Sequence, residues 1–135
     1  MNAVDSSVAI ASCASWHEAH DLAREAVDDS PRLVAHCALE TFATLTRLPW
    51  PHRMPTDVVA QFISQRFPEE PLVLPASRIR QLVGEFQRLG LSGGAVYDGL
   101  IALTAAEHGA HLLSLDRRAQ ETYRRCGVSF QILSR

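Results

Sequence analysis

The chain has 135 residues, of which 47% are hydrophobic, and a formal net charge of −2 at pH 7. These values predict one globular domain with its own core, and they exclude both a disordered chain and a globally basic nucleic-acid-binding protein. All 13 basic residues are arginine, so the chain lacks the lysine needed for Walker-A nucleotide binding, Schiff-base chemistry or receiver-type phosphoryl-aspartate chemistry.

The apolar residues occur in short runs, none of which approaches the roughly 20 residues of a membrane-spanning helix. The N-terminus has no basic region before its apolar residues, so no signal peptide is expected. Three widely spaced cysteines predict reduced thiols rather than a disulfide framework. We therefore expect a cytoplasmic protein with no membrane partner.

In the first half of the chain, short apolar runs alternate with helical patterns. We expect a strand over residues 1–4, a helical segment from residue 8, an amphipathic helix over 16–28, a strand over 32–35 and a helix over 37–48. The apolar spacing places Trp16 on the buried face of the helix over 16–28. In the helix over 37–48, the inward face is expected to carry Leu39, Phe42, Ala43, Leu45 and Thr46.

The second half begins with a proline-rich loop over residues 48–55 and continues the alternation. We expect Thr56 to cap a helix over 57–67, followed by a strand over 72–74, a helix over 76–89 that ends at Gly90, a helix over 95–106, a strand over 111–115, a helix over 117–125 and a strand over 128–132. This order predicts a three-layer α/β/α domain over residues 1–135, with a mostly parallel sheet of about four to five short strands.

Four carboxylates stand in apolar or strand-end surroundings. Asp5 and Asp116 each end an apolar run that predicts a strand, and parallel strand ends share one edge of a sheet. Glu40 and Asp98 each lie near the start of an apolar helix that would flank this edge. A lone buried carboxylate costs several kcal/mol, so the four acids are expected to share a ligand.

A divalent cation is the ligand that this chemistry favours. A helix N-terminus stabilises a nearby carboxylate by only about 0.3–1 kcal/mol, and four uncompensated acids would repel and raise one another's pKa values. Mg²⁺ and Mn²⁺ prefer oxygen ligands, and such a site activates water and stabilises the charge of a phosphodiester transition state. The sequence therefore predicts an acidic site for Mg²⁺, for which Mn²⁺ can substitute.

The flanks of the four acids resemble those of PIN-domain ribonucleases, and most closely the VapC-type toxins of toxin–antitoxin pairs. The matching segments, in order, are Val4-Asp5-Ser6-Ser7, Leu39-Glu40-Thr41, Thr46-Arg47-Leu48-Pro49, Tyr97-Asp98 and Leu113-Ser114-Leu115-Asp116-Arg117-Arg118. The resemblance implies a metal-dependent endoribonuclease in which Asp5, Glu40, Asp98 and Asp116 are the catalytic residues and metal ligands. It also implies that Ser7 and Ser114 orient groups of the site, and that cleavage leaves a 5′-phosphate and a 3′-hydroxyl.

The same resemblance implies an RNA substrate, with transfer or ribosomal RNA the leading candidates, a cognate antitoxin protein and a homodimer. Arg117 and Arg118 directly follow a proposed ligand, so we expect them to contact the RNA backbone. Arg47 is expected to do the same, and Trp50 offers a ring for stacking on a base. Apolar residues between 58 and 63 and between 79 and 86 are expected to form core, with the remainder available for a partner.

Four other interpretations remain open at this point. A catalytically inactive binding module would keep the fold without the chemistry. A phosphatase or phospho-acceptor domain would also have an acidic pocket, but it needs a lysine, or a second aspartate where this chain has Ser7. Cys13, His17 and His20 have helical metal-ligand spacing without a fourth ligand, and Cys37 beside His36 would be a nucleophile pair only if the fold arranged them.

Overall fold

The computed structural model describes residues 1–135, and its elements alternate much as the sequence predicts. In chain order they are β1 (Asn2–Val4), α1 (Ser6–Cys13), α2 (His20–Asp28), β2 (Arg32–Leu33), α3 (Ala35–Arg47), α4 (Thr56–Arg66), α5 (Ala76–Leu89), α6 (Ala95–Glu107), β3 (His111–Ser114), a 3-10 turn η1 (Arg117–Ala119), α7 (Gln120–Arg125) and β4 (Phe130–Ile132). None of the helices is long and apolar enough to cross a membrane.

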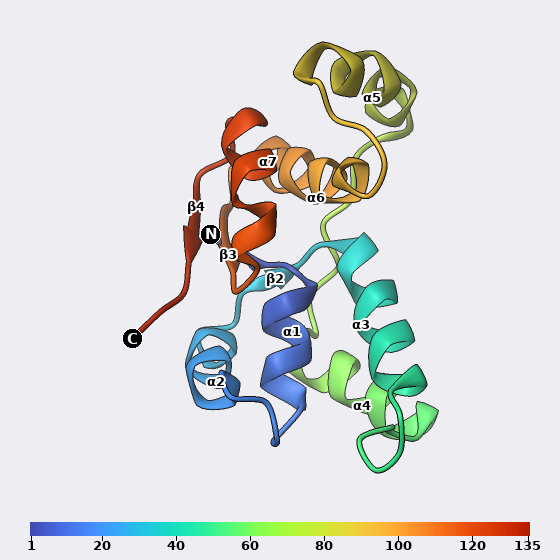
Figure 1. Cartoon of the computed structure of the whole chain (residues 1–135), viewed down its shortest axis with the longest axis vertical. Helices are drawn as coiled ribbons and strands as arrows, with labels where there is room; N and C mark the ends of the chain where they lie inside the picture. The colour runs from blue at the N-terminus through green and yellow to red at the C-terminus, as the bar shows by residue number, and fades with distance from the viewer.

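The four strands form one parallel sheet in the order β2-β1-β3-β4. In Figure 1 the sheet lies between α1 and α2 below and α6 and α7 above, which gives the expected three layers. The central strands β1 and β3 are covered on both faces, so Ala3, Val4, Leu112, Leu113 and Ser114 are buried. Because all strands are parallel, their carboxyl ends meet at one edge of the sheet.

The helix expected over residues 16–28 begins only at His20. The preceding segment turns instead, because the His17 backbone N–H donates to the Ala14 carbonyl and the Ala19 N–H donates to His17 Nδ1. Trp16 is therefore not on a buried helix face: it is 47% exposed and lies against the ring of His52, with 4.4 Å between ring centroids.

The inward face of α3 differs from the expected one. Cys37, Thr41 and Leu45 form the buried stripe, whereas Leu39 is 72% exposed. Phe42, Ala43 and Thr46 are not among the buried residues either. Because Thr41 is polar, the apolar pattern did not include it in the buried stripe at positions 37, 41 and 45. Of the five residues expected on the inward face, only Leu45 is buried.

Two smaller expectations fail at prolines. Pro55, not Thr56, occupies the N-cap position of α4, and no side chain caps that helix. Residues 72–74 form only an isolated bridge between Val34 and Leu72. Pro71 and Pro75 flank this segment and lack the backbone N–H that a longer ladder would use.

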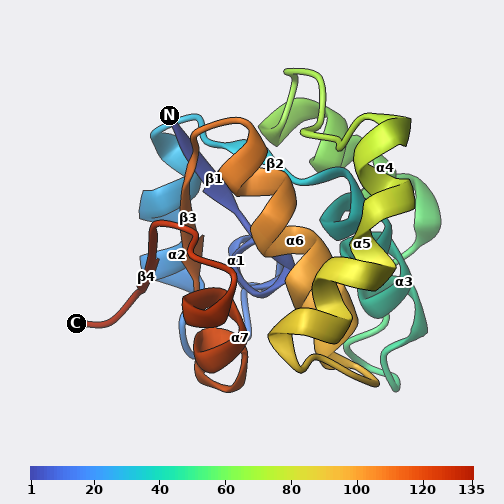
Figure 2. The same ribbon diagram turned by 90° about the horizontal axis from the view of Figure 1, so that it is seen from above.

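The packing of α5 against α6 fixes the helix that carries Asp98 (Figure 2). Gly90 ends α5 in the left-handed conformation, with φ of 72°, as the sequence predicts. On α6, Gly99 lies against Phe86 and Leu91, and a Cβ there would come within 2.8 Å of the Phe86 ring and 2.9 Å of a Leu91 methyl group. Gly99 is therefore required by the close approach of the two elements.

We expect Gly99→Ala to destabilise the protein by about 1–3 kcal/mol, because the added methyl group overpacks this contact. Urea unfolding measured by circular dichroism gives the change in free energy. Gly94→Ala is the matched control, since Gly94 has no heavy atom within 4 Å of a built Cβ and no positive φ. Equal stability of the Gly99→Ala and Gly94→Ala proteins would show that α5 and α6 do not pack this closely.

Candidate functional site

The carboxyl edge of the sheet gathers the segments that carry the four acids. Asp5 directly follows β1, and Asp116 follows β3 by one residue. Helices α1, α3 and α6 all begin at this edge, with Glu40 in the second turn of α3 and Asp98 in the first turn of α6. The partial positive charge of the three helix N-termini favours negative side chains here.

Asp5 is buried, with 2% of its surface exposed, and it serves as the N-cap of α1. Its Oδ1 accepts hydrogen bonds from the Ser7 N–H at 3.0 Å, the Val8 N–H at 3.4 Å and the Ser7 hydroxyl. Its Oδ2 accepts only the hydroxyl of Tyr123, at 2.7 Å. Burial raises the pKa of Asp5, and its hydrogen bonds offset only part of that rise.

Two serine hydroxyls join the ends of β1 and β3. Ser7 Oγ donates to Asp5 and accepts the Leu115 N–H at 2.8 Å. Ser114 Oγ lies 3.4 Å from Ser7 Oγ and accepts the Asp116 N–H at 3.0 Å. The pair of serines therefore fixes the backbone on which Asp5 and Asp116 sit.

Asp116 and Glu40 are partly exposed and have local partners. Asp116 caps η1 by accepting the Arg118 N–H at 3.0 Å, and the Arg118 Nε lies 3.6 Å from the same oxygen. Glu40 Oε1 accepts the Ser6 hydroxyl at 3.3 Å and lies 3.7 Å from His36 Nε2. Capping thus accounts for part of the placement of Asp5 and Asp116, but it accounts for neither Glu40 nor Asp98.

Asp98 is half-buried and has no hydrogen bond or ion pair. Its pKa is raised from 3.8 to about 6, first by desolvation and then by the negative charges of Asp116, Glu40 and Asp5; the guanidinium of Arg118 lowers it slightly. The charges of Asp116, Glu40 and Asp5 therefore reach Asp98 at this edge of the sheet. The Arg118 guanidinium offsets only part of their effect, and Asp98 forms no ion pair in the protein.

The donor chemistry of this edge fits a hard divalent cation, because all four side chains offer carboxylate oxygens. No group of three or more His, Cys, Asp and Glu side chains is close enough together to hold a metal ion. Cys13, His17 and His20 likewise form no such group. His17 and His20 use Nδ1 for backbone partners, the Ala19 N–H and the Ala11 carbonyl.

The site also contains residues that sequence reasoning missed. Tyr123 is buried, with 1% of its surface exposed, and donates to Asp5 from 118 residues away. His36 does not pair with Cys37 as a nucleophile would require. Its ring stacks on Tyr97, whereas the Cys37 thiol is buried and its pKa is raised well above 9, so the thiol stays protonated. In the sequence, the only indication that Tyr123 is buried is that it is the one aromatic residue in the polar segment 120–125.

The four residues expected to bind RNA divide into two groups. Arg117 and Arg118 lie beside Asp116 at the carboxyl edge, and both are exposed. Arg47 and Trp50 lie at the opposite end of α3 from its start at this edge, and Trp50 is 85% exposed. The structure therefore brings only Arg117 and Arg118 close to the carboxylates.

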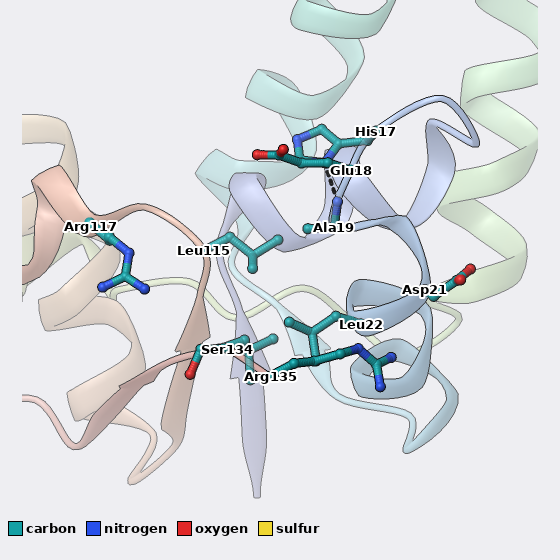
Figure 3. Close-up of a pocket in the computed structure, with 10 residues that line it drawn as sticks. His17, Glu18, Ala19, Asp21, Leu22, Leu115, Arg117, Ser134 and Arg135 are labelled. Atoms are coloured by element: carbon teal, nitrogen blue, oxygen red, sulfur yellow. Dashed lines mark hydrogen bonds between the residues drawn. The ribbon is translucent and has the colours of Figure 1, made fainter.

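The largest cavity, of about 640 Å³, adjoins this edge without containing any of the four acids. Figure 3 shows Leu115 and Leu22 between Arg117 on one side and Asp21 on the other, with Glu18 at the upper rim and Arg135 at the lower rim. Arg117 has no ion-pair partner, whereas Arg135 pairs with Glu25 at 2.9 Å. The guanidinium of Arg117 is therefore free for a ligand beside the acidic edge.

We expect Asp98→Asn to stabilise the metal-free protein at pH 7. The folded-state pKa of about 6 exceeds the ordinary value of 3.8, so ionisation of Asp98 destabilises the fold progressively as pH rises from about 4 to 6, and fully above that range. The pKa difference alone corresponds to about 3 kcal/mol, and partial exposure to solvent reduces this to about 1–2 kcal/mol. Urea unfolding in EDTA at pH 4 and pH 7 measures the effect.

At pH 4 the two proteins should be equally stable, because Asp98 is then largely protonated in the folded state. Glu69→Gln is the control, since Glu69 is exposed in a loop and should give no comparable gain at pH 7. If Asp98→Asn is no more stable than the original protein at pH 7, the carboxylate is not electrostatically strained.

Comparison with known proteins agrees with this geometry. The model of the PIN domain family matches residues 3–125. The chain is 40% identical over 134 residues to Ribonuclease VapC40 of Mycobacterium tuberculosis strains CDC 1551 and H37Rv, covering 99% of this chain and 100% of that protein. It is 39% identical over 132 residues to Ribonuclease VapC27 of strain H37Rv, covering 93% of this chain and 92% of that protein. The chain therefore belongs to the PIN domain family, and within it to the VapC type.

Proposed function

We propose that residues 1–135 form one functional domain, an endoribonuclease that depends on Mg²⁺, with Mn²⁺ able to substitute. The observation that carries this proposal is Asp98, a half-buried carboxylate without a hydrogen bond whose pKa three other acids help to raise. Carboxylates perturbed by burial and by neighbouring acids are typical of sites where a ligand supplies the compensating positive charge. The similarity to two proteins named as ribonucleases supports RNA as the substrate.

The proposed ligands are Asp5, Glu40, Asp98 and Asp116, directly or through water. When bound, the metal ion supplies positive charge that activates a water molecule and stabilises the phosphodiester transition state. Ser7 and Tyr123 hold the Asp5 carboxylate at a fixed angle, and Ser114 fixes the backbone of Asp116. The Glu40 side chain is 38% exposed, against 31% for Asp116. Glu40 would therefore be the ligand that accepts a proton from the attacking water.

Hydrolysis would leave a 5′-phosphate and a 3′-hydroxyl. Arg118, with 96% of its side chain exposed, and the unpaired Arg117 are placed to contact phosphates as the RNA crosses the edge. Arg47 and Trp50 lie farther along α3 and would contact a more distant part of the RNA. Transfer and ribosomal RNA are the proposed targets.

By similarity to the VapC relatives, we propose that the protein is a cytoplasmic toxin that inhibits translation and growth until a cognate antitoxin binds it. Exposed apolar side chains offer surface for that antitoxin or for a homodimer. Val83 on α5 is 80% exposed, Val73 before it is 55% exposed and Val58 on α4 is 43% exposed, whereas Leu82, Phe86 and Val59 on the same helices are buried.

The residues of the site argue against an inactive binding module and against a phosphatase or phospho-acceptor domain. An inactive binding module would have no reason to keep four interacting carboxylates at a cost in stability. A phosphatase of the acidic-pocket type needs a second aspartate where Ser7 stands, and Ser7 is instead engaged with Asp5 and Leu115. The absence of lysine removes the receiver-type alternative.

We expect Asp98→Asn to abolish RNA cleavage and the response to metal together. Millimolar Mn²⁺ should raise the melting temperature of the original protein by mass action and leave that of Asp98→Asn nearly unchanged. Differential scanning fluorimetry measures the change in melting temperature. Sequencing the RNA ends after brief expression measures cleavage and identifies the target. Asp57→Asn, which changes an exposed acid on α4, is the control and should behave like the original protein.

Full cleavage by a well-folded Asp98→Asn protein would refute the assignment of the catalytic residues. A Mn²⁺ response that Asp98→Asn retains in full would place the metal elsewhere on the chain.

We expect Arg117→Ala and Arg118→Ala each to weaken RNA binding and to reduce its dependence on salt. Removing one phosphate contact should lower the slope of log affinity against log salt by about 0.7 for single-stranded RNA. Fluorescence anisotropy at several salt concentrations gives both quantities. Arg66→Ala is the control, because Arg66 is already paired with Asp28. An unchanged affinity and slope in both variants would show that these arginines do not contact phosphate.

A further inference from the structure

An aromatic pair lies at the rim of the carboxylate site, where α3 meets α6. The rings of His36 and Tyr97 are parallel, with an interplanar angle of 4° and 5.4 Å between centroids. A parallel pair at this separation is offset rather than face to face, which is the favoured arrangement for stacked rings. The contact joins the two helices that carry Glu40 and Asp98.

The pair is tied to the carboxylates on both helices. Tyr97 immediately precedes Asp98 in α6, and His36 Nε2 lies 3.7 Å from Glu40 Oε1, one helical turn along α3. The orientation of the Tyr97 ring is therefore fixed relative to the acidic edge by a stacked neighbour. Single exposed aromatic residues are common on protein surfaces and need no explanation. A ring that a stacked neighbour holds in one orientation beside a proposed active site is suited to bind a ligand.

The Tyr97 ring keeps an open face. Tyr97 is 56% exposed although His36 covers part of one face, so most of the exposed area belongs to the other face and the ring edge. By contrast, Trp50 is 85% exposed and lies at the far end of α3, with no ring stacked against it. A base that stacked on Trp50 would have to order that ring as well as itself, which costs conformational entropy.

We propose that the open face of Tyr97, backed by His36, stacks on the nucleobase next to the phosphate that is cut. This inference rests on the proposed ribonuclease function and deepens it. Aromatic rings bind unpaired bases with little regard to sequence, because every base offers a π-face. The substrate at the cleavage position is accordingly a single-stranded segment or loop, whose base is free to leave its own stack.

His36 acts as a positioning residue in this proposal, since it touches Tyr97 and Glu40 rather than the RNA. The exposed Trp50 and the arginines would supply contacts farther from the cut phosphate. The stacking contact is made equally in the ground state and the transition state, so its loss should appear in KM and not in kcat.

The test uses short single-stranded RNA with 2-aminopurine at the base beside the cleavage position found by end sequencing. Binding to the Asp98→Asn protein, which leaves the RNA intact, should quench the fluorescence of this base by stacking. Adding Tyr97→Ala to that protein should remove the quenching and weaken affinity about 5- to 150-fold, the range for loss of one base–aromatic stack. Tyr97→Phe should keep both, because it keeps the ring.

In cleavage assays with the otherwise unchanged protein, Tyr97→Ala should raise KM by the same factor with kcat within about twofold, and Trp50→Ala should change neither as much. Quenching and affinity that survive in Tyr97→Ala would overturn the proposal, as would equal losses in Tyr97→Phe and Tyr97→Ala. Loss of cleavage in Asp98→Asn without any effect of Tyr97→Ala would leave the ribonuclease function standing and refute the stacking site alone. An original protein that cuts no RNA would refute the function. The binding arm would then be run with 2-aminopurine at each position of the RNA in turn, and the absence of any quenching that depends on Tyr97 would refute the stacking.

Discussion

Mutual repulsion among carboxylates at the sheet edge is the constraint on which the rest of the site depends. Asp5 is desolvated, and desolvation, reinforced by the charges of Asp116, Glu40 and Asp5, raises the pKa of Asp98 to about 6. Folding alone does not favour this arrangement, because each ionised acid makes the others less stable. The fold tolerates it through hydrogen bonds to Asp5 and three helix N-termini, and leaves Asp98 for a ligand to neutralise.

The same residues that build the fold also build the site. Asp5 and Asp116 cap α1 and η1, so their position is part of the local folding of the chain as well as part of the proposed chemistry. Ser7 is used twice, once by Asp5 and once by the backbone of Leu115. Asp5 and Asp116 would be needed as helix caps even without a catalytic role. Asp98 caps no helix, so its position is the stronger argument for a ligand site.

Much of the fold follows from the alternation of apolar runs, which predicted the parallel sheet, its helices on both faces and the left-handed Gly90. The site was predictable as a group because strand ends of a parallel sheet must meet, which placed Asp5 and Asp116 together. What the pattern missed depends on tertiary packing. A buried polar residue, Thr41, displaced the expected stripe of α3, and backbone turns held by His17 delayed the start of α2.

Local sequence patterns could not predict contacts between segments that lie far apart in the chain. Neither the stacking of His36 on Tyr97 nor the bond from Tyr123 to Asp5 has a periodic signal, since each joins elements that the topology brings together. Trp50 shows what a local pattern leaves open: its place in a proline-rich loop predicts an exposed ring, and the direction of α3 decides that this ring lies at the opposite end of the helix from the carboxylates.

The bond between Tyr123 and Asp5 also bears on how the protein is made. Its two ends are separated by 118 residues, and the acid belongs to the first strand while the hydroxyl belongs to the last helix. During synthesis on the ribosome, Asp5 therefore has only its local partners Ser7 and Val8 until α7 has left the exit tunnel. A nascent chain cannot complete the hydrogen bonding of this edge before α7 has been translated.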